Sequence, residues 1–268
     1  QPLVAGDERL LVWILLRDTV EEIADAAVQK GFRTLGMSDH SYTAFDPTFC
    51  MKDGVFDRYV EKVNECKAKY AGALDIFCGM ELDYYSENIP TDRLDYIIGS
   101  VHYVKRGGVY YGVDHSAEGE KQGIDEGCGG DVHLYIREYY RNICDHIAKN
   151  PVNVVGHFDV LTKFGLIDEE DPAYRREALA AADYAIERGV IIEINTGAVF
   201  KKLKKNPYPN AFILKHICEK GGRVCIDSDS HIIDSLDFYF EESCALMKAC
   251  GFRTAAMLTK DGFCDVEL

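Results

Sequence analysis

Short apolar runs alternate with helical stretches along most of this chain, and this alternation limits the folds that the chain can adopt. Each of six apolar runs is long enough for one buried strand: 34–37, 75–78, 96–101, 152–155, 190–194 and 224–226. Helix signals lie between them, such as the capping box of Thr19 and Glu22 and the helix-opening Pro172. Strands that alternate with helices are typical of a parallel sheet with crossover helices. Six or seven such units predict an α/β fold with a closed or nearly closed barrel.

Other segments predict a further strand, an insertion and a hairpin. Residues 10–16 are apolar and predict a first strand within residues 1–17. Residues 105–130 are polar and rich in glycine, and a connection of this length predicts a lid or a substrate-binding insertion. Residues 254–268 predict a C-terminal hairpin that turns at a Lys-Asp-Gly sequence. No Gly-x-Gly-x-x-Gly follows a first strand, so a dinucleotide-binding fold is not favoured. We expect one domain over residues 1–268.

Composition excludes several classes of protein. The chain has 268 residues and is 47% hydrophobic, enough for one sizeable core. Its formal net charge of −15 argues against a nucleic-acid groove. No apolar run is long enough to span a membrane, and no clear secretory signal is visible. The ten cysteines are scattered without a CxxC pair, which predicts reduced thiols in a cytoplasmic protein.

Ionisable side chains gather where the predicted strands end. The stretch from Arg223 to His231 changes from apolar residues to Asp229 and His231, two positions apart and therefore on one side of an extended segment. Alone, it fits a polar turn with a solvated histidine equally well. Five predicted strand ends carry such groups, however: His40, Glu81, His102, His157, Asp229 and His231. In a (β/α) barrel these ends surround one mouth, and imidazoles with carboxylates are ligands for zinc, manganese or iron.

Several motifs at these strand ends resemble one known family. They are Ser38-Asp39-His40, Gly79-Met80-Glu81, Ser100-Val101-His102, Gly156-His157-Phe158-Asp159, Glu193-Ile194-Asn195-Thr196 and Ser228-Asp229-Ser230-His231. Together they resemble the PHP (polymerase and histidinol phosphatase) family, and the insertion around Asp114 resembles its monofunctional histidinol-phosphatase branch. The resemblance covers about residues 18–268 and implies a distorted (β/α)7 barrel, a trinuclear metal site at the carboxyl ends of the strands, and hydrolysis of L-histidinol phosphate in histidine biosynthesis.

The resemblance also implies a role for each strand-end residue. The family's ligands map onto Glu81 as the carboxylate bridging two metals, Asp229 on the first metal, His102 and His157 on the second, and His40 and His231 on the third. The implied cofactors are divalent metals, up to three, and zinc, manganese and iron all accept these donors. Two cations on a shared carboxylate can hold a hydroxide between them and clamp the phosphoryl oxygens, so that no protein nucleophile is required.

The start of the chain departs from the family pattern. The family opens with a strand that ends in His-x-His, whereas residues 1–17 contain no histidine. Asp7 and Glu8 are conceivable substitute ligands. Two explanations stay open: an altered or misread start, which the good match from Asp18 onward favours, and a site that has lost part of its ligands.

Further candidates lie beside the matched motifs. Asp39, Asp159 and Asn195 are natural partners for orienting the metal ligands, and Asp159 is also a candidate acid for protonating the leaving alkoxide. Lys163 and Lys201 are candidate phosphate-binding cations, although a solvated charge run explains Lys201 equally well.

Two more residues could reach the mouth. His115 lies in the insertion and is a candidate substrate contact, although a loop histidine without a metal partner is more often simply exposed. Arg17 is a candidate by its position alone.

Three functions remain open from the sequence. The first is a metal-dependent phosphatase acting on L-histidinol phosphate. The second is a PHP phosphoesterase for nucleotides or another small phosphate, and the third is a degenerate PHP domain that binds a ligand without turnover. The expected partner is a small phosphate monoester, with no nucleic acid and no membrane. The sequence does not indicate the oligomeric state.

Overall fold

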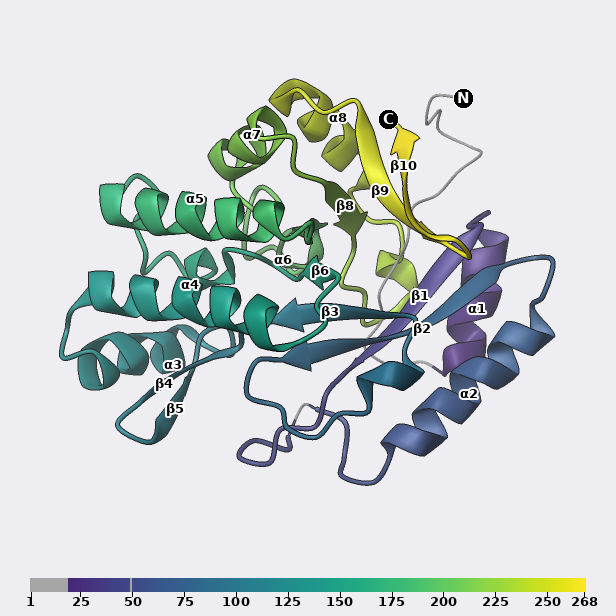
Figure 1. The fold of residues 1–268 in the computed structure, drawn as a ribbon, viewed down its shortest axis with the longest axis horizontal. Helices are drawn as coiled ribbons and strands as arrows, with labels where there is room; N and C mark the ends of the chain where they lie inside the picture. Colours follow the sequence, from purple (N-terminus) through teal and green to yellow (C-terminus); the bar gives the residue numbers. More distant parts are fainter. Residues whose placement is uncertain (1–18, 49) are drawn as a thin grey trace.

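A curved parallel sheet organises the computed structural model, which describes residues 19–48 and 50–268 (Figure 1). The sheet has six strands in the order β1-β2-β3-β6-β7-β8, and all neighbouring strands run parallel. The strands are β1 (Thr34–His40), β2 (Asp75–Asp83), β3 (Tyr96–Ser100), β6 (Val154–Val155), β7 (Ile191–Asn195) and β8 (Val224–Asp227). The predicted α/β fold class is confirmed. The strand predicted at 10–16 lies outside the described residues.

Helices cross over between the strands and cover one face of the sheet (Figure 1). The longer ones are α1 (Val20–Gln29), α2 (Phe56–Lys69), α4 (Val132–Lys149), α5 (Pro172–Glu187), α7 (Ala211–Glu219) and α8 (Phe240–Cys250). Shorter helical segments are η1 (Thr91–Arg93), η3 (Val160–Thr162), α6 (Gly197–Phe200) and η4 (Ile233–Ser235). The capping box that opens α1 is confirmed: Glu22 N donates to Thr19 Oγ1, and Thr19 N donates to Glu22 Oε2.

The two faces of the sheet have different roles because successive side chains of a strand alternate between them. On β2, Ile76, Cys78 and Met80 belong to the large core shared with the helices. The residues between them face the other side, where Phe77 and the inward residues of neighbouring strands form a second, smaller apolar cluster. Farther along β2 the same inward face carries Glu81. The inner face is therefore apolar at the beginning of the strands and polar at their carboxyl ends.

The C-terminal residues form a hairpin that covers part of this inner face. Strands β9 (Thr254–Thr259) and β10 (Gly262–Glu267) pair antiparallel, and β9 lies against β8. Ala256 and Leu258 of β9 join the smaller apolar cluster. The hairpin thereby fills the inner face away from the polar strand ends.

The segment 105–130 has more regular structure than the sequence led us to expect. Strands β4 (Tyr103–Arg106) and β5 (Val109–Gly112) form an antiparallel hairpin, followed by α3 (Ala117–Gln122) and a π-helical turn, η2 (Gly123–Gly127). Gly107 and Gly108 make the hairpin turn with φ of 57° and 85°, which a pair of glycines allows at little cost. This unit packs beside α4 (Figure 1). Among the described residues, no helix combines the length and apolarity needed to cross a membrane.

Candidate metal centre

A cavity of about 210 Å³ opens at the carboxyl ends of the parallel strands. All six residues that the sequence assigns to a metal site line it: His40, Glu81, His102, His157, Asp229 and His231. They come from segments far apart in the sequence, and the sheet brings them to one edge because parallel strands all end on the same side.

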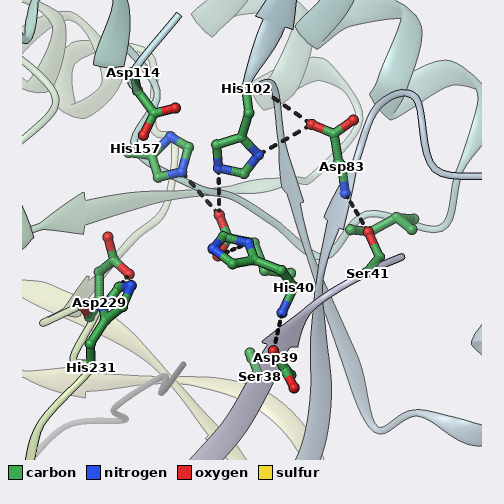
Figure 2. A network of polar contacts seen from close by, with 12 residues as sticks. Ser38, Asp39, His40, Ser41, Asp83, His102, Asp114, His157, Asp229 and His231 are labelled. Carbon is green, nitrogen blue, oxygen red and sulfur yellow. Dashed lines mark hydrogen bonds and ion pairs between the residues drawn. The ribbon is translucent and has the colours of Figure 1, made fainter. Parts of the chain in front are cut away.

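Glu81 is the centre of this group. Its Oε2 lies 3.1 Å from His40 Nδ1, and its Oε1 lies 3.2 Å from His102 Nε2 and 3.0 Å from His157 Nε2. Figure 2 shows the imidazoles of His40, His102 and His157 gathered around one place. The two carboxylate oxygens thus face different imidazoles, which is the arrangement a carboxylate needs to serve more than one cation.

The buried charges of the group are mutually dependent. Burial raises the pKa of Glu81, but attraction to His40 and hydrogen bonds from His102 and His157 outweigh burial and hold that pKa well below its usual range. Burial lowers the pKa of His102, yet its bonds to Asp83 and Glu81 raise it well above the ordinary value. For His40, burial dominates and lowers the pKa. The Glu81 carboxylate is therefore ionised in a buried place, where it needs positive charge close by.

Carboxylates outside the cavity orient the ligands. His102 Nδ1 lies 3.2 Å from Asp83 Oδ2, so His102 Nε2 is left for the cavity. Asp39 Oδ1 accepts a hydrogen bond of 2.8 Å from the backbone N–H of His40. Burial raises the pKa of Asp39 to about 6. Asp39 does not line the cavity, and its hydrogen bond to the backbone of His40 is the kind of contact that a supporting residue makes.

Asp229 and His231 follow β8 and lie on another side of the same cavity (Figure 2). The backbone at Asp229 has φ of 46°, an uncommon conformation for a residue other than glycine. His231 Nδ1 lies 2.8 Å from the Asp229 carbonyl oxygen, which makes Nδ1 the donor and leaves Nε2 available. The Asp229 carboxylate lies close to the backbone of Gly197. Glycine leaves room for it there, since a Cβ at position 197 would lie 3.0 Å from Asp229 Oδ2.

These residues fit divalent metal ions. The donors are imidazole nitrogens and carboxylate oxygens, the set that zinc, manganese and iron accept. One ligand atom from each of His40, Glu81 and His102 lies within 4.8 Å of the others. In addition, Nδ1 of His157 is buried and has no hydrogen-bond partner among the described residues. A buried nitrogen without a partner is costly unless something else binds to it.

Comparison with known proteins agrees with this geometry. Residues 17–197 match the model of the PHP domain. The chain belongs to the PHP domain family. Among curated PHP relatives, the "Probable histidinol-phosphatase" of Deinococcus radiodurans is 29% identical over 245 residues, covering 88% of this chain and 89% of the relative. The "Histidinol-phosphatase" of Bacillus subtilis is 26% identical over 257 residues, covering 87% and 93%.

A solved structure shares the fold of this PHP chain. The histidinol phosphate phosphatase of Lactococcus lactis subsp. lactis, complexed with Zn, L-histidinol and phosphate, superimposes with a TM-score of 0.72 at 18% identity. The match covers 96% of this chain and all of the other chain. It establishes the similarity of the fold.

Four other predicted residues line the cavity of this PHP chain: His115, Lys163, Asn195 and Lys201. Lys163 Nζ donates to the backbone oxygen of Asp114 at 2.7 Å and lies 3.3 Å from its Oδ2. Asn195 accepts from the backbone N–H of Gly197 and donates to Glu193 Oε2 at 3.0 Å. His115 is exposed on the insertion.

The structure places Asp159 away from the cavity. Its Oδ2 accepts from Tyr174 Oη at 2.9 Å and from the backbone N–H of Asn210 at 3.0 Å. The chain turns at His157, where φ is 22°, and continues into η3, so the two-residue alternation of a strand no longer applies. These contacts favour a supporting role for Asp159 and give no geometric support for a proton donor.

Two polar residues of the cavity lining were not among the predicted site residues. Asp114 follows the β4–β5 hairpin, and Tyr208 lies in the connection between α6 and α7. Asp114 stood in a motif of the resemblance, whereas nothing in the local sequence marks Tyr208. Asp7, Glu8 and Arg17 lie outside the described residues.

Proposed function

We propose that this PHP protein is a metal-dependent phosphomonoesterase that hydrolyses L-histidinol phosphate to L-histidinol and phosphate. The observation that carries the proposal is the position of Glu81 between three imidazoles in the wall of one cavity. The names of the Deinococcus and Bacillus relatives, which align over most of their length, support this choice of substrate. So does the L-histidinol and phosphate bound in the Lactococcus structure.

The proposed cofactors are divalent metals, up to three, of zinc, manganese or iron. Glu81 with His102 and His157 would hold one ion, and Glu81 with Asp229 would hold a second. His40 and His231 would contribute to a third. When bound, such ions supply an activated water and neutralise charge on the phosphoryl oxygens.

The other cavity residues suit a phosphate monoester that carries an amine. Lys201 places positive charge on the wall, where it attracts the phosphate dianion as a point charge. Burial raises the pKa of Asp114, but attraction to His102 and Lys163 outweighs burial and keeps the carboxyl ionised. Asp114 is therefore suited to the substrate's ammonium group. Along the described lining there is no Ser, Thr or Cys side chain, which supports water as the nucleophile.

The proposed partner is this small substrate, with no nucleic acid or membrane. The proposed location is the cytoplasm, in keeping with ten cysteines that are all free thiols.

The test is metal content per chain by elemental analysis, together with phosphate release from L-histidinol phosphate by the same sample. About three metals per chain with turnover is the expected result. Faster release from nucleotides or other small phosphates, in a panel of substrates, would favour the broader phosphoesterase. One metal or none, with no release after zinc or manganese is added, would contradict the catalytic proposal and favour a domain that binds without turnover.

A further inference from the structure

The wall of the cavity contains a phenol that the metal centre does not use. Tyr208 is only 2% exposed and lines the same cavity as the Glu81 group. Within the described residues, its hydroxyl has no hydrogen-bond partner. A buried hydroxyl without a partner lowers stability, because it has left water without a replacement for the lost hydrogen bond. Such a group at a cavity wall indicates that its partner is a ligand.

The backbone holds Tyr208 firmly beside the end of β7. Asn195 N donates to the carbonyl oxygen of Tyr208 at 2.9 Å, and Tyr208 N donates to the carbonyl oxygen of Asn195 at 3.0 Å. Lys204 Nζ lies 5.5 Å from the centre of the Tyr208 ring. The phenol is thus fixed in position before any ligand arrives, which reduces the entropy lost on binding.

The hydroxyl of Tyr208 is a hydrogen-bond donor over the whole physiological pH range. Burial raises the pKa of Tyr208 far above its usual range, and the nearby carboxylates of Asp159 and Asp114 raise it further. A neutral phenol donates well to an anion, and hydrogen bonds to charged oxygens are the stronger kind. Lys201 lines the same cavity and adds positive charge.

We propose that Tyr208 Oη donates a hydrogen bond to a non-bridging oxygen of the substrate's phosphate group. This inference rests on the proposed phosphatase function. Substrate, transition state and phosphate product all carry such an oxygen, so the contact strengthens their binding alike. Tyr208 is therefore a residue that binds and positions phosphate, and the proton of the hydroxyl stays on Tyr208 throughout.

The test compares Tyr208→Phe with the parent in three measurements. In calorimetric titrations of the metal-loaded protein with inorganic phosphate, the variant should bind roughly tenfold more weakly. KM for L-histidinol phosphate should rise by a similar factor while kcat changes less than about threefold. Without metal or phosphate, the variant should unfold at the same or a higher urea concentration, because the substitution removes an unpartnered hydroxyl.

Tyr135→Phe is the matched control. Tyr135 is fully buried on α4, and its hydroxyl likewise has no partner in the described part of the chain, but it does not line the cavity. The Tyr135→Phe variant should bind phosphate with the same affinity as the parent. Equal phosphate affinity in Tyr208→Phe and the parent would overturn the inference about Tyr208 and leave the proposed function standing. A marked loss of ligand-free stability in Tyr208→Phe would do the same. A parent that binds no phosphate would overturn the proposed function as well.

Discussion

Asp83 and His102 form a buried pair at the ends of two neighbouring strands. Asp83 Oδ2 lies 3.2 Å from both His102 Nδ1 and the backbone nitrogen of His102. The pair assigns the proton of the imidazole to Nδ1 and directs Nε2 toward Glu81. A carboxylate in this position also makes the imidazole a stronger ligand.

Asp83→Asn should weaken metal binding without removing a ligand. The amide keeps the size of the side chain but loses the charge that orients and polarises His102, and we expect a loss of about 10- to 100-fold in metal affinity. Competition titration with a chromogenic chelator measures this. Asp92→Asn, at an exposed position, is the control. An affinity within twofold of the parent would show that Asp83 does not support the centre.

Glu81→Gln tests the centre itself. The variant retains the shape of the side chain, but a neutral amide cannot hold two cations between the same imidazoles. We expect metal content to fall and phosphate release to drop by at least about 1000-fold. Glu120→Gln controls for replacing a buried glutamate, because Glu120 is fully buried and does not line the cavity. Comparable losses in both variants would mean that damage to the fold, and not the metal centre, explains the result.

The strand-end residues could be predicted because their position directly after an apolar run indicates where they lie in the sheet. Glu81 directly follows an apolar run, and strand geometry alone then fixes the face on which its side chain lies. The order of strands and helices also follows from local patterns, so the parallel sheet could be predicted. The ligand roles came from the family resemblance, and they remain proposals.

The other contributions to the cavity depend on tertiary structure. Tyr208 reaches the cavity because its backbone pairs with Asn195, a contact between segments that no local pattern announces. Asp159 is directed away because the chain leaves strand geometry at His157. Rules of alternation apply only while the chain is extended, so they give no placement for Asp159.

Glu120 should make stability depend on pH. Burial, with repulsion from Asp114, raises the pKa of Glu120 to about 8 in the folded protein. The ordinary pKa of a glutamate, 4.5, applies in the unfolded chain. Between these values the folded state holds a proton that the unfolded chain releases. The contribution of Glu120 to stability is therefore complete below about pH 4.5 and is lost as the pH rises through about 8.

Glu120→Gln should flatten this dependence. Between pH 5 and 8 the parent should lose roughly 3.5 kcal/mol more stability than the variant, as measured by urea unfolding of metal-free protein. Glu118→Gln, at an exposed position on the same helix, should behave like the parent. Parallel curves for Glu120→Gln and the parent would contradict the raised pKa.

Gly197→Ala should disturb the metal centre while leaving the fold intact. A Cβ at this position would lie 3.0 Å from Asp229 Oδ2 and 3.2 Å from Asn195 Oδ1, so the Asp229 carboxylate must shift by a few tenths of an ångström. Alanine in place of glycine at the start of α6 should change stability by less than about 1 kcal/mol.

We therefore expect metal affinity to fall by roughly three- to tenfold, with ligand-free unfolding nearly unchanged. Gly119→Ala is the control, because its Cβ would lie 3.3 Å from Ser116 Oγ, on α3 and outside the cavity. If Gly197→Ala bound metal as tightly as the parent, the close approach of Gly197 to the Asp229 carboxylate would not matter for metal binding, and the prediction would be wrong.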